Sequence, residues 1–486
     1  MAKREVDMLK GSIFKGLLTI TVPIMLMNVL QSIYNIVDMS MLKTNSPDGL
    51  SAGAVGVSST LISLITGLLI GISSGTTVVV ARFIGKGDEE KVHRSIGTAI
   101  LFSILGGVFL MLIGILFAPL FMKMLKCPDE LLKNATLYFR LYFLGVPMLM
   151  VYNFSASILR AAGDSRRPMY YSLLGGGLKV LLTFVFVVLL KLDVLGVSVA
   201  TIISWGVMCF LTIFTLIKNQ GVVKLKRDKI RFYSQELKDI LFIGVPTGAQ
   251  QALYSVANVI ITIAVNEYGL EYASKFPEAL RETYAAYPST GISIANTFDG
   301  LMYQLVMAPT YAVMPYVSQN VGNRNMKRAM EAVWKGMLIT VAVGAVFGSL
   351  SAIFAVQLSS LMSDVPEVLE FSRQKMVIIS STYFIMSINE ILGVALKGMK
   401  RPIVPMVCTM IFMCGIRFPW VYLVFPHLKT LTFLYLIWPI GWVTSGITLC
   451  FFFFPTVKKL KRQFKAELET EQKEKEAKKV EFFYER

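Results

Sequence analysis

Long apolar segments recur from one end of this chain to the other, and each is long enough to cross a lipid bilayer as a helix. A hydrocarbon core of about 30 Å requires about 20 predominantly apolar residues in a helix. The 55% hydrophobic content points the same way, because a soluble chain of 486 residues would be less apolar. The sequence therefore predicts an all-α polytopic membrane protein whose main partner is the bilayer itself.

We expect twelve transmembrane helices, each bounded by charged residues or by glycine and proline. Their expected positions are 13–40, 52–81, 95–120, 135–159, 168–190, 194–217, 239–266, 293–320, 331–358, 372–396, 402–425 and 430–456. With twelve helices, most Lys and Arg residues of the loops fall on the side of the N-terminus. Because cytoplasmic loops carry the excess of basic residues, both termini are expected in the cytoplasm. This placement accounts for the net charge of +17, so no nucleic-acid partner is expected.

The two halves of the chain resemble each other in sequence. Matching residues include Lys15 with Lys238, Pro23 with Pro246, and Asn35 with Asn258. We therefore expect two pseudo-symmetric six-helix lobes, at 1–217 and 239–456. A basic cytoplasmic linker at 218–238 joins them, and a charged cytoplasmic tail follows at 457–486. Parallel repeats of this kind are typical of transporters, although a duplicated channel remains the alternative.

Residues 271–289 form a polar insertion after the seventh expected helix. Tyr272, Phe276, Leu280 and Tyr284 recur at every fourth position, which predicts one apolar stripe on a short helix. We expect this helix to lie over the outer end of the second lobe; a gating lid is the alternative.

The first apolar segment carries polar residues that a simple membrane anchor would lack. Asn28, Gln31 and Asn35 share one face of the expected helix, and Asp38 follows three residues later. A carboxylate in a membrane helix is energetically costly and usually faces a cavity or a charged partner. The alternative is that Asp38 lies at the end of the helix, in contact with water or headgroups.

Several motifs, taken in order, resemble the multidrug and toxic compound extrusion (MATE) family, most closely its bacterial branch. They are YNIVD, ARFIGKGDEEK, ILRAAGDSRRPM, SQNVGNRNMKR, ALKGMKRPIVPM and CGIRFPWVYLVFP. The resemblance implies a V-shaped pair of six-helix lobes in the cytoplasmic (inner) membrane of a prokaryote, with a monomer expected. It also implies an antiporter that exchanges H⁺ or Na⁺ for drug-like, amphipathic and often cationic compounds, with no further cofactor. Asp38 matches the acid of the family's first helix, and Asn153 matches a polar position near that acid.

The fifth expected helix departs from the family pattern. Lys179 stands where an asparagine is usual, and Thr183 stands where a second acid is usual. The two residues share one helix face. A lysine near Asp38 would repel a cation, which argues against an ordinary Na⁺ site. We predict an ion-coupling set of Asp38, Lys179, Thr183, Asn153 and Asn35.

A second set of intramembrane charges lies in the second half. The repeat places Glu390 at the counterpart of Asn153 and Arg417 at the counterpart of Thr183. Because buried charges are normally paired, Glu390 with Arg417 and Asp38 with Lys179 are the expected couples, with static salt bridges as the alternative role. The predicted substrate-binding residues are Gln31, Asn258, Asp299, Glu390 and Arg417.

No pattern of enzyme chemistry is present. The sequence lacks HExxH and GxxxxGK[ST], and its two GxSxG matches, at 49–53 and 71–75, fall in or beside the second expected membrane helix rather than between a strand and a helix, so neither a protease nor a nucleotide-driven motor is indicated. The chain has only two histidines, and its cysteines do not occur at the paired spacings of metal-binding motifs, so no metal centre is expected. Besides the antiporter, two functions stay open: a flippase for lipid-linked oligosaccharides in the same superfamily, and a non-transporting membrane sensor.

Overall fold

The computed structural model describes residues 6–45, 50–125, 127 and 129–484, and within these residues every regular element is helical. The helices of the first half are α1 (Ile13–Asn45), α2 (Leu50–Lys86), α3 (Glu89–Met124), α4 (Asp129–Ala161), α5 (Arg166–Thr183), which continues as the π-helix η1 (Phe184–Leu189), and α6 (Asp193–Lys218). Long apolar segments thus form long helices, as their composition requires.

The second half begins after a linker that contains the short 3₁₀-helix η2 (Arg227–Lys229). Its helices are α7 (Ser234–Ala273), η3 (Glu278–Leu280), α8 (Arg281–Gly322), α9 (Met326–Ile353), α10 (Ala355–Ser360), α11 (Pro366–Ser380), α12 (Tyr383–Gly398), α13 (Ile403–Cys408), η4 (Thr409–Gly415), α14 (Arg417–Pro419), η5 (Trp420–Val424), α15 (Phe425–Leu428), α16 (Leu431–Tyr435) and α17 (Ile437–Tyr484).

Within the described residues, ten helical stretches are long and apolar enough to span a membrane, and α11 with α12 makes an eleventh, bent by 47°. The twelfth is α8, which packs against α1, α2, α7, α9, α11 and α12 although its sequence is more polar and contains three prolines. This layout agrees with the expected twelve-helix membrane protein. The main difference is that the tenth expected helix is broken.

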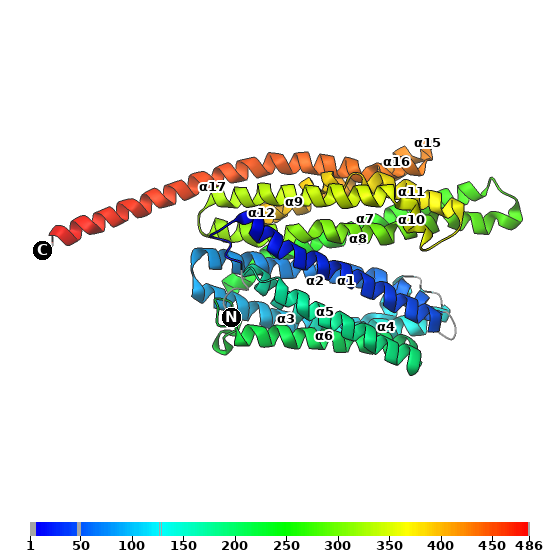
Figure 1. Ribbon diagram of the computed structural model, residues 1–486, viewed down its shortest axis with the longest axis horizontal. Helices are drawn as coiled ribbons and strands as arrows, with labels where there is room; N and C mark the ends of the chain where they lie inside the picture. Colours follow the sequence, from blue (N-terminus) through cyan, green and yellow to red (C-terminus); the bar gives the residue numbers. More distant parts are fainter. Residues whose placement is uncertain (1–5, 46–49, 126, 128, 485–486) are drawn as a thin grey trace.

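The helices form two layers that correspond to the two halves of the sequence (Figure 1). Helices α2 to α6 make one layer, and α7 to α12 with α17 make the other, while α1 runs obliquely along both. Helix α1 packs against α5 of its own half and against α8 of the other half. Both ends of the chain lie toward the same side of the molecule (Figure 1).

The two layers meet most extensively where α2 packs along α7. We call this surface the glycine contact; it consists of Gly67, Gly71 and Gly75 on α2 and Gly244 and Gly248 on α7. A Cβ atom on Gly71 would lie 2.3 Å from the Cα atom of Gly248, so the two backbones touch. Small residues permit this close approach between membrane helices.

The layers also touch at the side of the molecule that carries the termini. The Gln319 amide at the end of α8 donates to the Ala161 carbonyl at the end of α4, at 2.7 Å. A Cβ atom on Gly85 of α2 would lie 1.9 Å from the Gln319 carbonyl oxygen. The structure is therefore closed between the layers at this side.

The insertion 271–289 does not form the separate short helix that we expected. Helix α7 continues to Ala273 and α8 begins at Arg281, so the insertion extends both helices as a hairpin that projects from the end of the molecule (Figure 1). Phe276 and Tyr284 stack with ring centroids 3.8 Å apart, whereas Leu280 is 45% exposed. Aromatic stacking, which does not require one continuous helix, brings these rings together.

The charged tail continues the last membrane helix without interruption. Helix α17 extends well beyond the two layers (Figure 1). Arg324, in the loop between α8 and α9, forms ion pairs with Glu467 at 3.1 Å and Glu471 at 2.5 Å. These contacts fix the base of the tail to the second half.

Candidate functional site

The first lobe holds a buried ion pair. Asp38 lies near the end of α1 and Lys179 lies in the last turns of α5, and these two helices pack against each other. The Lys179 Nζ atom is 2.6 Å from the Asp38 Oδ2 atom. Only 5% of the Asp38 side chain and 18% of the Lys179 side chain are exposed. The predicted couple is therefore present, and Asp38 is not a solvated cap.

The other residues predicted around Asp38 are less closely engaged. Thr183 is fully buried one turn beyond Lys179, where α5 changes into the π-helix η1. The Asn153 amide donates to the Leu149 carbonyl of its own helix at 2.9 Å. The side chain of Asn35 lies outside the described residues. The ion pair is thus the best-defined part of the predicted coupling site.

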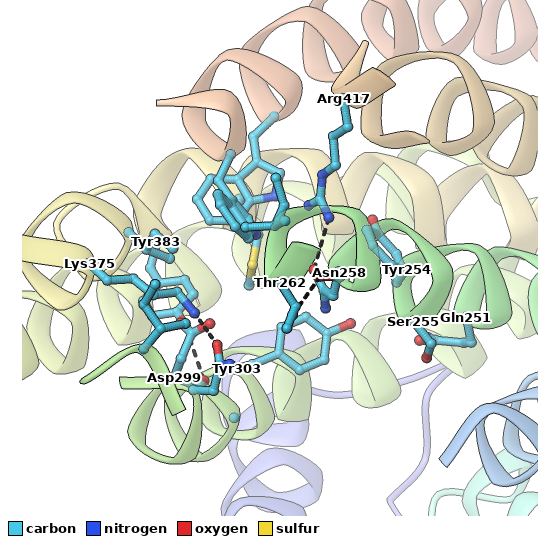
Figure 2. A pocket seen from close by; sticks show the side chains of 18 of the residues that line it. Gln251, Tyr254, Ser255, Asn258, Thr262, Asp299, Tyr303, Lys375, Tyr383 and Arg417 are labelled. Carbon is cyan, nitrogen blue, oxygen red and sulfur yellow. Dashed lines mark hydrogen bonds between the residues drawn. The ribbon is translucent and has the colours of Figure 1, made fainter. Parts of the chain in front are cut away.

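The second lobe encloses a cavity of about 350 Å³, built by α7, α8, α11, α12, α14 and α17 (Figure 2). Four of the predicted substrate-binding residues line it: Asn258, Asp299, Glu390 and Arg417. The fifth, Gln31, does not; its amide donates to the Ser172 hydroxyl at 3.0 Å, between α1 and α5. Gln31 therefore belongs to the first lobe.

Two cationic side chains lie on one ring of the cavity wall. The Arg417 guanidinium lies 4.7 Å and the Lys375 Nζ atom 5.6 Å from the centroid of Trp438. Arg417 Nη1 donates to the Asn258 amide oxygen at 2.9 Å, and Lys375 Nζ donates to the Asn296 amide oxygen (Figure 2). Both cations are almost completely buried, and both of these hydrogen-bond partners are neutral.

The two acids of the cavity accept hydrogen bonds from tyrosines. The Tyr383 hydroxyl donates to the Asp299 carboxylate (Figure 2), and the Tyr254 hydroxyl donates to Glu390 Oε1 at 3.1 Å. The cavity therefore presents both positive and negative groups, and Asp299 interacts electrostatically with Lys375 without forming a direct ion pair.

Our prediction of a Glu390–Arg417 ion pair is wrong. Among the described residues, no ion pair includes either side chain, although both line the same cavity. Glu390 is bonded to Tyr254 and Arg417 to Asn258. The repeat predicted which helices the two charges occupy, but it could not predict which side chains they meet.

Sequence reasoning also missed important members of the cavity. These are Lys375, Asn296, Tyr254, Tyr383 and Trp438. Lys375 is 3% exposed, yet we did not include it among the expected intramembrane charges. Its position three residues inside the tenth expected helix was a usable signal, because an intramembrane charge usually marks a site. The aromatic residues carried no comparable signal, since such residues are common throughout membrane helices.

A family model described as MatE matches residues 23–185 and 284–423, which lie in both halves of the chain. The chain belongs to the MatE family. This confirms the resemblance drawn from the sequence motifs, and it confirms the expected all-α polytopic fold.

Relatives and solved structures agree with this assignment. The MatE protein is 24% identical to "Probable multidrug resistance protein YpnP" of Bacillus subtilis over 413 residues, covering 85% of this chain and 88% of the relative. It is 24% identical to "Probable multidrug resistance protein NorM" of Thermotoga maritima, covering 83% and 84%. A crystal structure of a MATE protein in a straight conformation superposes with a TM-score of 0.85 at 20% identity, covering 95% of this chain and all of that one. The last likeness establishes the two-lobed fold alone.

Proposed function

We propose that this MatE protein is a secondary active exporter, which moves amphipathic drug-like compounds across the membrane in exchange for a coupling ion by alternating access. The names of its relatives support the cargo class. The excess of basic residues on the terminal side supports an orientation in the prokaryotic cytoplasmic membrane with both termini in the cytoplasm. The closed terminal side would then correspond to a state that is shut toward the cytoplasm.

The observation that carries the proposal is the buried contact between Asp38 and Lys179. An ammonium group at this distance stabilises the ionised carboxylate, so proton uptake by Asp38 must weaken or break the pair. The carboxylate and the lysine lie on different helices, α1 and α5, so breaking the pair removes one of the contacts that hold these two helices together. Protonation is thereby linked to helix packing, which is what an ion-coupled transporter requires.

The same contact bears on the identity of the ion. A Na⁺ ion bound at Asp38 would meet the Lys179 ammonium, whereas a proton would neutralise Asp38 and displace that ammonium. We therefore propose H⁺ as the coupling ion.

The test is export of either of two fluorescent dyes, the cation ethidium and the anion fluorescein, from vesicles that contain the purified protein, driven by an imposed proton gradient. Asp38→Asn removes the titratable group while preserving its size, so gradient-driven export should be lost; thermal unfolding of the purified variant checks that the protein is still folded. Asp228→Asn makes the same chemical change at an exposed position of the linker and serves as the matched control.

Normal gradient-driven export by Asp38→Asn would refute the coupling role. Movement of a labelled lipid between leaflets, without export of either dye, would favour the flippase instead. Absence of both activities in vesicles with correctly folded protein would contradict the exporter altogether and favour the sensor.

A further inference from the structure

We propose that the cavity of the second lobe binds aromatic organic anions, whose acidic group lies between Lys375 and Arg417. This inference rests on the proposed exporter and specifies the class of cargo that this cavity takes. It differs from the expectation of cationic cargo that the family resemblance implies.

The first reason is that neither cation forms a direct ion pair; Asp299 acts on Lys375 electrostatically, but its carboxylate is hydrogen-bonded to Tyr383. Lys375 is 3% and Arg417 2% exposed, and no ion pair of the described residues includes either one. A buried charge is normally compensated by an opposite charge. Here the observed hydrogen-bond partners are the amide oxygens of Asn258 and Asn296. Arginine has five N–H donors and lysine three, so donors are left over for a carboxylate or a phosphate.

The second reason is that the two cations gather at one place. They come from α11 and α14, which are distant in sequence, and both lie within 6 Å of the centroid of the Trp438 ring. A cation–π contact is worth only about 0.5–2 kcal/mol, so the ring does not cancel two buried charges. A ligand anion would meet two positive groups beside one ring, and a ligand cation would find the Trp438 ring already occupied.

The third reason is that the acids of the cavity are already engaged. Asp299 accepts a hydrogen bond from Tyr383, and Glu390 accepts one from Tyr254. Hydrogen bonds of this kind disperse the charge of a carboxylate and use one of its acceptor positions. The acids therefore attract a ligand cation less than two unbonded carboxylates would.

The size and lining of the cavity suit a small aromatic molecule. Its volume of about 350 Å³ lies at the lower end of the range of ligand pockets. Aromatic side chains, including Tyr303 and Trp442, supply surfaces for an aromatic ring beside the charged groups. An aromatic carboxylate and an aromatic phosphate both meet these requirements, and the experiment separates them.

The test is equilibrium binding to the full-length protein in nanodiscs, measured by calorimetry with three ligands that share one ring system. These are 1-naphthoate, 1-naphthyl phosphate and 1-naphthylmethylammonium. At least one anion should bind at least about tenfold more tightly than the cation, and the better of the two anions identifies carboxylate or phosphate as the preferred group. Tighter binding of the cation than of both anions would overturn the proposal.

Two substitutions locate the binding. Lys375→Gln and Arg417→Gln should each weaken anion binding about tenfold or more, as expected for the loss of a charge-assisted hydrogen bond. Lys465→Gln removes a lysine that is 81% exposed on α17 and should leave binding unchanged. Unchanged anion binding in both cavity variants would also overturn the proposal.

If the glutamine variants fail to fold, variants that retain the positive charge test the proposal instead. Arg417→Lys and Lys375→Arg keep the positive charge, so they should retain the preference for anions over the cation. Loss of that preference in both would contradict the proposal. Anion binding is measured on the full-length protein without an ion gradient, whereas export is measured with one. Failure of the exporter and failure of anion binding are thus distinguishable.

Discussion

Substitution of Gly71 by alanine should open the terminal side of the protein. A Cβ atom at this position would lie 2.3 Å from the Cα atom and 2.4 Å from the nitrogen of Gly248, whereas ordinary contacts begin near 3.4 Å. The obstacle is backbone rather than a flexible side chain, so α2 and α7 must separate by about 1 Å. Overpacking of this kind destabilises by about 1–3 kcal/mol.

This destabilisation applies to the state in which α2 and α7 are in contact. If the layers separate in another state of the transport cycle, the ratio of closed to open molecules falls about 5- to 150-fold. Gly56→Ala is the matched control, because it lies on the same helix and its Cβ atom would meet nothing within 4 Å. Both substitutions replace glycine by alanine in the same helix and gain the same helix propensity. Any difference between the two variants therefore reports the effect of the methyl group on the glycine contact.

The assay is the distance between spin labels at positions 91 and 327, in a background whose five cysteines are replaced by alanine. Lys91 on α3 and Lys327 on α9 are exposed and lie at the terminal side, one in each lobe. Gly71→Ala should shift the distribution of distances between the two spin labels from short to long values, and Gly56→Ala should not. Identical distance distributions for the two variants would refute the reasoning, because the glycine contact would then tolerate a methyl group.

Two further predictions concern the charged groups. Lys179→Asn removes the ammonium that would repel a second cation at Asp38, so export in vesicles should respond to an imposed Na⁺ gradient; no response to Na⁺ would mean that Lys179 does not exclude this ion. Because Glu390 and Arg417 form no ion pair, the losses of thermal stability caused by Glu390→Gln and Arg417→Met should add in the double variant; recovery of most of the loss would indicate direct pairing.

The Asp38–Lys179 couple illustrates what a sequence pattern can predict about a membrane site. Both residues are charged within apolar segments, and few partners are available to a charge in lipid. The family resemblance implied that Lys179 lies near Asp38, and because buried charges normally pair, these two residues were the expected couple; the structure contains it. The same reasoning failed for Glu390 and Arg417, because tyrosine and asparagine side chains from other helices satisfy each charge separately.

The sequence by itself determined the helical membrane fold, its division into two related halves and the segments that carry buried charges. It could do so because hydrocarbon imposes a length and a composition on every segment that crosses it. Only the tertiary structure decided the break between α11 and α12, the hairpin of the insertion and the gathering of Lys375 and Arg417 at Trp438. These features depend on contacts between helices that are remote in the chain. The sequence does not reveal such contacts, because the pattern of apolar residues on a helix face is the same whichever helix packs against that face.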